Sequence, residues 1–372
     1  MQKYPPGPGR TSYFDFNTLP DELARVEKTR YSLSNPESGD QDAKCGITST
    51  YHASPWEKFW MQNIHAIQSD DFLWTRGCEE MLSQESRRSV QTWLEYWKDR
   101  GNQEVASRVA WDENVFSFHE YIDTCTRKSI GKLPIEPLVG SLRHPLAVCD
   151  AKIQKDFFGF RRRVSAAKVN KDYMLETRLA DFILKSPECT KAKKCRRFLF
   201  DLGASTYSDG KGGPSMSWFI ETYKKAGFEF DRVLSWDARK FEPREVFKGM
   251  PFELLKSMSY FNLPVESEPE SEYNPWRYIR ELTMPEDFVV VKLDIDAPAT
   301  EAELVRQILF DDDQDGKVFL SDLIDEFYFE HHVWGSGMSP DWTIDRLDGD
   351  IAGSYRLFSE LRKRGIRAHS WV

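Results

Sequence analysis

Apolar and polar positions alternate in a regular way along the second half of the chain. Short apolar runs that end in polar residues predict buried strands, and the segments between them repeat apolar residues at helical spacing. The predicted strands lie at 197–203, 231–238, 257–267, 287–296, 325–333 and 366–372. The predicted helices lie at 215–227, 243–249, 275–283, 300–310 and 352–365. Alternating strands and helices indicate an α/β fold with a mostly parallel sheet, and we place this domain at 191–372.

The first half of the chain, residues 1–190, predicts a mainly helical region with a loose tail. Residues 1 to about 50 are polar and rich in loop-forming residues. Apolar spacing predicts helices at 54–67, 78–101, 113–131 and 172–186. Ser54 and Pro55 are typical of a helix start, and prolines break 133–149 into turns. We expect the many aromatic residues here to form a core and to cover part of a substrate pocket.

Charge and cysteine content narrow the class of protein. The formal net charge is −9, which disfavours a general nucleic-acid-binding protein. No apolar run is long enough for a membrane helix, and the first residues do not have the pattern of a signal peptide. The six cysteines form no CxxC pair, which disfavours a zinc ribbon. We expect free thiols in a reducing cytoplasm, with a disulfide across 189–195 as the alternative.

A glycine-containing turn follows the first predicted strand of the α/β domain. Asp201 ends the strand, Gly203 lets the backbone approach a ligand closely, and the next helix offers its N-terminus. The second strand ends at Asp237, where a carboxylate suits the two hydroxyl donors of a ribose; Glu242 is the alternative. A full GxGxxG is missing, so the pattern favours a ligand without a pyrophosphate. A purely structural turn is the competing interpretation.

Four stretches of this domain resemble FkbM-type methyltransferases, which use S-adenosylmethionine (SAM) on the class I methyltransferase fold. They are FLFDLGAS, VLSWDA, VVVKLDIDA and EFYFEHH, and the resemblance covers about 196–372. It implies a Rossmann-like sheet and a loop, 205–215, that closes over the cofactor. The cofactor-binding residues that it implies are Asp201, Gly203, Ala204, Ser205 and Asp237. The chain departs from the family pattern at Ser205, where the family has Asn, and at Asp296–Ala297, where it has Glu-Gly.

Acids and histidines gather at the predicted ends of two further strands. Asp294 and Asp296 end one strand and point to the same side, and Glu330, His331 and His332 end the next. Neighbouring strands lie about 5 Å apart, so these side chains should converge beside a methyl donor. The structural alternative is that the acids cap helix N-termini and the histidines make supporting hydrogen bonds.

Two chemistries suit such a cluster. One is general base catalysis on a substrate hydroxyl, for which the candidates are Asp294, Asp296, His331 and His332. The other is a divalent cation, Mg²⁺ or Mn²⁺, that orients and acidifies the hydroxyl. The candidate ligands of that cation are Asp294, Asp296, Glu330 and His332.

The segment from Asp311 to Asp322 has the spacing of an EF-hand calcium loop. The residues at its first, third, fifth, sixth and last positions are Asp311, Asp313, Asp315, Gly316 and Asp322. A predicted strand follows almost at once, which leaves little room for the exit helix of an EF-hand. We therefore expect an acidic loop at the amino ends of the strands rather than a calcium site.

Together these patterns predict a SAM-dependent methyltransferase that acts on a hydroxyl of a small molecule or sugar. Arg143, His144 and Tyr173 are further candidates to face the substrate. We expect a small-molecule acceptor and no nucleic-acid partner. Two other functions stay open: a non-catalytic binding or scaffold protein on the same fold, and a calcium-responsive regulator built on the acidic loop.

Overall fold

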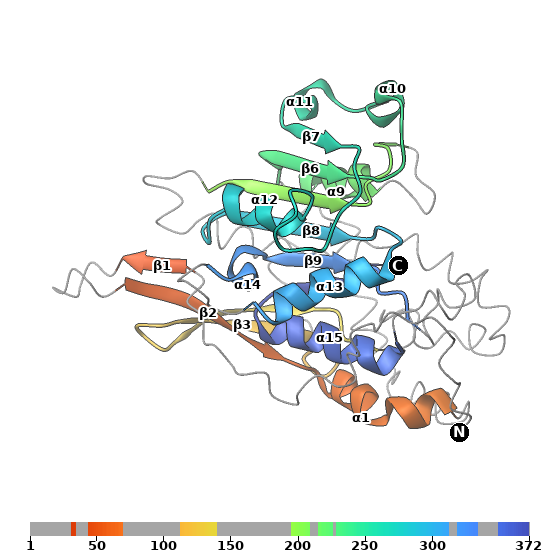
Figure 1. Ribbon diagram of the computed structural model, residues 1–372. Helices are drawn as coiled ribbons and strands as arrows, with labels where there is room; N and C mark the ends of the chain where they lie inside the picture. Colours follow the sequence, from red (N-terminus) through yellow and green to blue (C-terminus); the bar gives the residue numbers. More distant parts are fainter. Residues whose placement is uncertain are drawn as a thin grey trace.

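A computed structural model describes residues 31–34, 44–69, 112–139, 195–208, 215–225, 228–311, 318–333 and 349–371. Its strands form two sheets (Figure 1). The first half contributes an antiparallel sheet, in the pairing order β1 (Tyr31–Ser34), β2 (Lys44–His52), β3 (Ser117–Asp123) and β4 (Ser129–Ile135). The helix α1 (Pro55–Ser69) follows β2.

The second half forms a six-stranded parallel sheet in the order β10-β9-β8-β5-β6-β7. Its strands are β5 (Arg197–Leu202), β6 (Arg232–Trp236), β7 (Met258–Phe261), β8 (Phe288–Leu293), β9 (Glu326–Phe329) and β10 (Arg367–Ser370). Counted along the chain and read from β7, this is the order 3-2-1-4-5-6 of a doubly wound sheet. The expected α/β class with a Rossmann-like parallel sheet is therefore confirmed.

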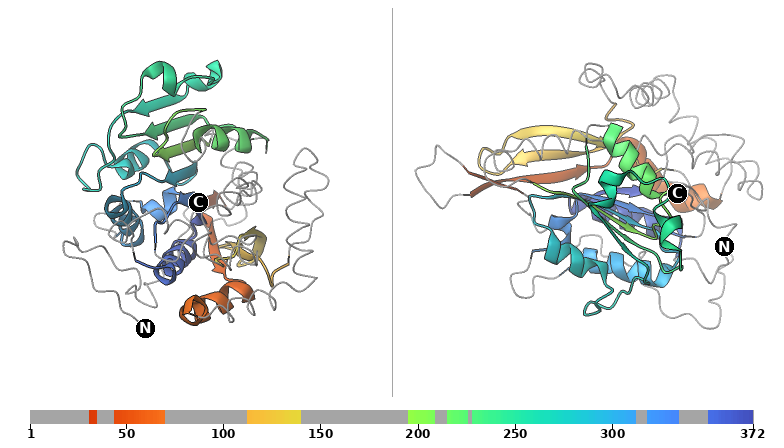
Figure 2. Two further views of the ribbon diagram at one scale, coloured as in Figure 1. Left: turned by 90° about the vertical axis from the view of Figure 1, so that its right-hand side faces the viewer. Right: turned by 90° about the horizontal axis from the view of Figure 1, so that it is seen from above.

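Helices cover both faces of this sheet. The helices of this half are α9 (Ser215–Lys225), α10 (Pro243–Val246), α11 (Phe252–Leu255), α12 (Pro275–Leu282), α13 (Pro298–Leu309), α14 (Leu320–Leu323) and α15 (Ile351–Lys363). Figure 2 shows α9 on one face and α12, α13 and α15 on the other. All strands and helices expected in this half are present, whereas the short helices α11 and α14 were not expected.

Local sequence explains the ends of the helices and the burial of the strands. The side chain of Asn274 accepts a hydrogen bond from the backbone N–H of Trp276 (2.9 Å) and caps α12. Asp350 caps α15 in the same way through Gly353 (2.9 Å). The strand β8 is buried along its whole length, as its nearly continuous apolar run predicts.

The helical prediction for 113–131 is wrong, because this segment forms β3 and β4. The expected loop before residue 50 is wrong where it becomes β1 and β2. β3 pairs with β2 on one side and β4 on the other, so its backbone groups are satisfied across the sheet. A short apolar segment can match both the helical and the strand period, and here cross-strand pairing decided.

The predicted helix at 54–67 is confirmed as α1, where the Ser54 hydroxyl accepts a hydrogen bond from the N–H of Glu57 (3.1 Å). The helices predicted at 78–101 and 172–186 lie outside the described residues. Turns were expected from 133 onwards, but β4 extends to Ile135.

Two cysteines correct the expectation of free thiols. Cys125 and Cys195 each take part in a disulfide bond. The alternative bridge across 189–195 involves Cys189, which lies outside the described residues. The sequence alone does not show which cysteines form disulfides, because a disulfide depends on two cysteines that the fold brings to within bonding distance. Within the described ranges, none of the helices combines the length and the apolar character needed to cross a bilayer.

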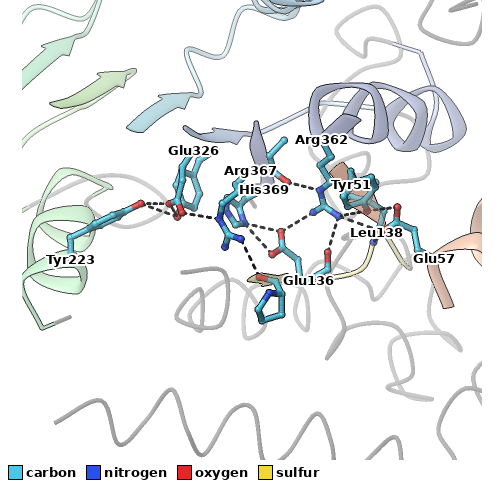
Figure 3. A network of polar contacts seen from close by, with 12 residues as sticks. Tyr51, Glu57, Glu136, Leu138, Tyr223, Glu326, Arg362, Arg367 and His369 are labelled. Atoms are coloured by element: carbon cyan, nitrogen blue, oxygen red, sulfur yellow. Dashed lines mark hydrogen bonds and ion pairs between the residues drawn. The ribbon is translucent and has the colours of Figure 1, made fainter. Parts of the chain in front are cut away.

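Buried charges join the two sheets (Figure 3). The Arg362 guanidinium on α15 donates to the hydroxyl of Tyr51 (3.1 Å), to the Glu57 carboxylate (3.4 Å) and to the Glu136 carbonyl (2.9 Å). His369 Nδ1 lies 3.0 Å from both carboxylate oxygens of Glu136. The first half therefore packs against the α15–β10 edge of the parallel sheet through ion pairs that are shielded from water.

Candidate active site

The candidate site lies at the carboxyl ends of β5, β6, β8 and β9. Parallel pairing of β5 with β6 and β8, and of β8 with β9, aligns these ends along one edge of the sheet. In open α/β sheets, ligands bind in the crevice at this edge. The expectation that the β8 and β9 ends are neighbours is confirmed.

The turn after β5 can be made only with glycine. Gly203 has φ +86°, and a Cβ atom there would lie 1.7 Å from the carbonyl oxygen of Asp294. The backbone N–H groups of Gly203 and Ala204 donate to the carbonyl of Trp236 (2.8 and 3.0 Å). The turn is thereby pressed against the ends of both neighbouring strands, which is a structural reason for the glycine.

Asp201 faces the protein interior rather than the edge. Its buried carboxylate accepts hydrogen bonds from the Ser215 hydroxyl (3.1 and 3.3 Å), and one oxygen lies 3.7 Å from Lys292 Nζ. Burial raises the pKa of Asp201, although Lys292 acts in the opposite direction. The residue thus ties the start of α9 to β5, a structural role behind the Gly203 turn.

Lys292 organises the strand ends and was not among the expected site residues. Its buried ammonium donates to the Gly203 carbonyl (2.8 Å) and lies 3.1 Å from an Asp294 carboxylate oxygen. Burial alone would lower the pKa of Lys292, but Asp294 and Asp201 raise it. A lysine within the buried run VVVKL is the sequence signal that could have identified it, because a buried ammonium needs carboxylate or carbonyl partners.

Asp237 lies at the end of β6, as expected for a ribose-binding acid. Its carboxylate accepts the backbone N–H of Ser205 (2.8 Å) and pairs with Arg239 (2.7 Å). Tyr260 donates its hydroxyl to the Ser205 carbonyl (2.9 Å), and Asn262 donates to the Asp237 carbonyl (2.8 Å). The alternative acid, Glu242, is exposed and precedes α10. Arg239, Tyr260 and Asn262 were missed, since charge or hydroxyl alone does not show which loop residues meet.

His332 lies at the centre of a second polar cluster, at the ends of β8 and β9. Its Nε2 is 3.8 Å from Asp296 and 3.7 Å from Glu330, and its Nδ1 is 3.6 Å from Glu301. Asp296, Glu330 and His332 each offer a ligand atom within 4.8 Å of the others, which is close enough to share a metal ion. Glu301, in the first turn of α13, also accepts the N–H of Ile295 (2.8 Å).

Electrostatics in this cluster favour a positive charge. Burial acts to lower the pKa of His332, but Glu301, Glu330 and Asp294 raise it to about 9. Burial raises the pKa of Glu301. Without a metal, this raised pKa favours the protonated imidazole at neutral pH. Glu301 was missed in the sequence, although an acid in the first turn after a strand end was a usable signal.

Two of the expected catalytic residues have additional partners outside the His332 cluster. Asp294 pairs with Lys292, which holds the pKa of its carboxyl below the ordinary value although burial opposes this. His331 Nδ1 lies 3.0 Å from the Ser354 hydroxyl on α15, and its ring stacks on Phe329. Of the four expected metal ligands, Asp296, Glu330 and His332 bring ligand atoms to within 4.8 Å of one another. Asp294 pairs with Lys292 and also interacts with Glu330 and His332.

Asp311, the first residue of the EF-hand-like segment before β9, is held by protein contacts. Asp311 accepts hydrogen bonds from the Arg280 guanidinium (2.5 Å) and from the N–H of Leu320 (2.5 Å). Asp322 lies in the four-residue helix α14, and β9 begins shortly afterwards. These contacts engage both carboxylate oxygens of Asp311, the residue at the first position of the EF-hand spacing. Asp313, Asp315 and Gly316 lie outside the described residues.

Three further candidates, Arg143, His144 and Tyr173, and part of the expected covering loop (209–214) also lie outside the described residues. Comparison with known proteins gives no match, whether to a family model, to a curated protein or to a solved structure.

Proposed function

We propose that the protein binds SAM at the ends of β5 and β6 and transfers its methyl group to a hydroxyl held at the ends of β8 and β9. The observation that carries this proposal is the alignment of the Gly203 turn, the Asp237 carboxylate and the His332 cluster along one edge of a doubly wound sheet. Such an edge brings a nucleoside-binding acid next to groups that act on a second substrate.

The residues at the β5 and β6 ends are compatible with a nucleoside cofactor. Asp237 supplies carboxylate acceptors for a ribose, and the turn at Gly203 keeps the backbone close to the neighbouring strands. Ser205 and Asp296 both have left-handed backbone (φ +58° for each), a conformation that is uncommon outside glycine and concentrates at functional sites. SAM, when bound, supplies an electrophilic methyl group.

The His332 cluster prepares the acceptor in one of two ways. In the first, a carboxylate of Asp296 or Glu330 takes the hydroxyl proton while the protonated His332 holds the carboxylates in position. In the second, Asp296, Glu330 and His332 bind a divalent cation that lowers the pKa of the hydroxyl. The raised pKa of His332 disfavours the imidazole itself as the base.

A non-catalytic binding protein is the second candidate. It is favoured by one observation: Arg239 engages both oxygens of Asp237, the acceptors that a ribose would use.

The disulfide bonds at Cys125 and Cys195 lead us to propose an oxidising compartment instead of the cytoplasm.

Calorimetry with SAM and S-adenosylhomocysteine tests the cofactor. We expect binding by the parent protein, and a loss of about 1.5–3 kcal/mol in Asp237→Asn, because charge-assisted acceptors are removed. Glu242→Gln, which changes an exposed acid on the same loop, is the matched control and should bind like the parent. Binding without methyl transfer to any hydroxyl compound of a sugar and catechol panel would favour the non-catalytic candidate.

A further inference from the structure

The Asp237 carboxylate makes four hydrogen bonds that divide into two pairs. The backbone N–H groups of Ser205 and Arg239 donate to Oδ2 and Oδ1, respectively, each at 2.8 Å. The Arg239 side chain donates through Nε to Oδ1 (3.1 Å) and through Nη2 to Oδ2 (2.7 Å). The backbone therefore fixes the carboxylate, and the guanidinium takes the remaining acceptor position on each oxygen.

A guanidinium presents two parallel N–H donors, and a vicinal diol presents two O–H donors at a similar separation. We propose that Asp237 forms a vicinal-diol site that the chain closes with its own Arg239, so that a ribonucleoside binds by displacing this side chain. The inference rests on the ribose role of Asp237 in the proposed function. It adds a residue that sets the affinity of the site and a step that precedes binding.

The arrangement lets Arg239 leave without disturbing the loop. Asn262 donates to the backbone carbonyls of both Asp237 and Arg239, so the main chain is held independently of the guanidinium. The Asp237 side chain is 4% exposed, whereas the Arg239 side chain is 55% exposed and can rotate into water. Asp296 also acts on the guanidinium electrostatically, which gives the displaced charge a second carboxylate to approach.

If Arg239 closes the site, the Asp237 carboxylate is free in only a fraction of the protein molecules. The apparent affinity for a ribonucleoside is then reduced in proportion to that fraction. Arg239→Met removes the guanidinium and its two donors but keeps an unbranched side chain. We expect it to bind adenosine and S-adenosylhomocysteine about 3- to 10-fold more tightly than the parent, the range set by an ion pair that is half exposed. Arg239→Lys keeps the positive charge without the paired donors of the guanidinium. Its affinity for adenosine should lie between those of the parent and Arg239→Met.

Two controls separate the diol from general effects. Arg232→Met removes the same charge at the amino end of β6, where the guanidinium contacts Ser259, and should leave binding unchanged. The probe 2′,3′-dideoxyadenosine lacks the diol, so its affinity should be equal in the parent and Arg239→Met. A thermal melt of each variant verifies that it is folded. If Arg239→Met does not fold, the comparison is made between the parent and Arg239→Lys.

The outcomes distinguish the inference from the function on which it rests. If the parent binds adenosine or S-adenosylhomocysteine and Arg239→Met binds them equally or more weakly, Arg239 does not close the site and the cofactor proposal stands. Equal tightening of the dideoxy probe would also overturn the inference, because the gain would not involve the diol. If neither protein binds any of the adenosine compounds, the ribose role of Asp237 and the inference both fail.

Discussion

Glu301 Oε2 lies 3.6 Å from His332 Nδ1. The other ring nitrogen, Nε2, faces Asp296 and Glu330. Both side chains are buried, and Glu301 is anchored by the N–H of Ile295. A carboxylate that orients the far nitrogen of an imidazole is a recurring arrangement around functional histidines. This relationship motivates the first two predictions.

The stability of the metal-free protein should depend on pH through His332. Its folded-state pKa of about 9 lies above the ordinary value of 6.5, so the protonated ring favours folding. This contribution is complete below pH 6.5 and is lost as the pH rises through 9, with a size of about 3 kcal/mol. Chemical denaturation in chelator, from pH 6 to 10, measures it.

The matched variants for this experiment are His332→Gln and His331→Gln. The first should remove the decline in the free energy of unfolding between pH 6.5 and 9. The second removes the neighbouring imidazole, which faces Ser354, and should keep the decline. An unchanged pH profile in His332→Gln would show that this cluster does not hold the proton.

If the cluster binds a cation, Mn²⁺ titration followed by calorimetry or paramagnetic resonance should detect it. Asp296→Asn, Glu330→Gln and His332→Gln each replace a carboxylate or imidazole ligand with a neutral amide and should weaken binding at least 10-fold. Glu301→Gln should weaken it by about 10- to 100-fold through the orientation of His332.

Glu303→Gln, on the same helix and paired with Arg306, is the control for the cation experiment and should bind Mn²⁺ like the parent. Absence of Mn²⁺ binding at millimolar concentration, together with full activity in chelator, would leave the carboxylate-base version.

Gly203→Ala should disrupt the site and the fold together. The added Cβ would overlap the carbonyl of Asp294, and alanine disfavours φ +86°. We expect a loss of at least about 3 kcal/mol in the free energy of unfolding, or no folded protein. Gly131→Ala, where a Cβ has nothing within 4 Å, should change stability by less than about 0.5 kcal/mol in the same denaturation experiment.

Arg362→Met should destabilise the whole protein rather than one half. It leaves the buried carboxylates of Glu57 and Glu136 without the guanidinium, which costs about 3–5 kcal/mol when one partner of a buried pair is removed. Lys363→Met removes an exposed partner of Glu360 and should cost less than about 1 kcal/mol.

Hydrogen exchange in β2, β3 and β9 of Arg362→Met should then increase together. Faster exchange confined to β2 and β3 would mean that the first half unfolds independently of the parallel sheet.

Calcium should not raise the melting temperature. Asp311 already accepts from Arg280 and from the N–H of Leu320, so it would have to abandon both to bind a cation. Asp311→Ala should instead lower stability by about 1–3 kcal/mol, because two donors lose their acceptor. A calcium-dependent rise in the melting temperature that disappears in Asp311→Ala would restore the regulator hypothesis, since a ligand held by the folded state must stabilise it.

The sequence by itself determined the parallel sheet and the strand ends where chemistry can occur. Apolar runs such as FVVVKL are long enough and uniform enough to be read as buried strands without knowledge of their neighbours. The residues that directly follow a strand must lie near its carboxyl end, so the pattern alone located Asp237 after β6 and His332 shortly after β9. In the first half, the alternation in SFHEYID was too short to exclude a helix, and pairing with β2 and β4 decided the structure.

Tertiary structure decided which of the edge residues meet. Adjacent residues at a strand end face opposite sides, so His332 joins the acids while His331 contacts Ser354 on α15. Lys292 pairs with Asp294, Glu301 on α13 contacts His332, and Arg239 pairs with Asp237. Spacing along the chain determines at which end of a strand or helix a residue lies. Ion pairing between elements depends on distances and burial that arise only when the sheet and helices pack together.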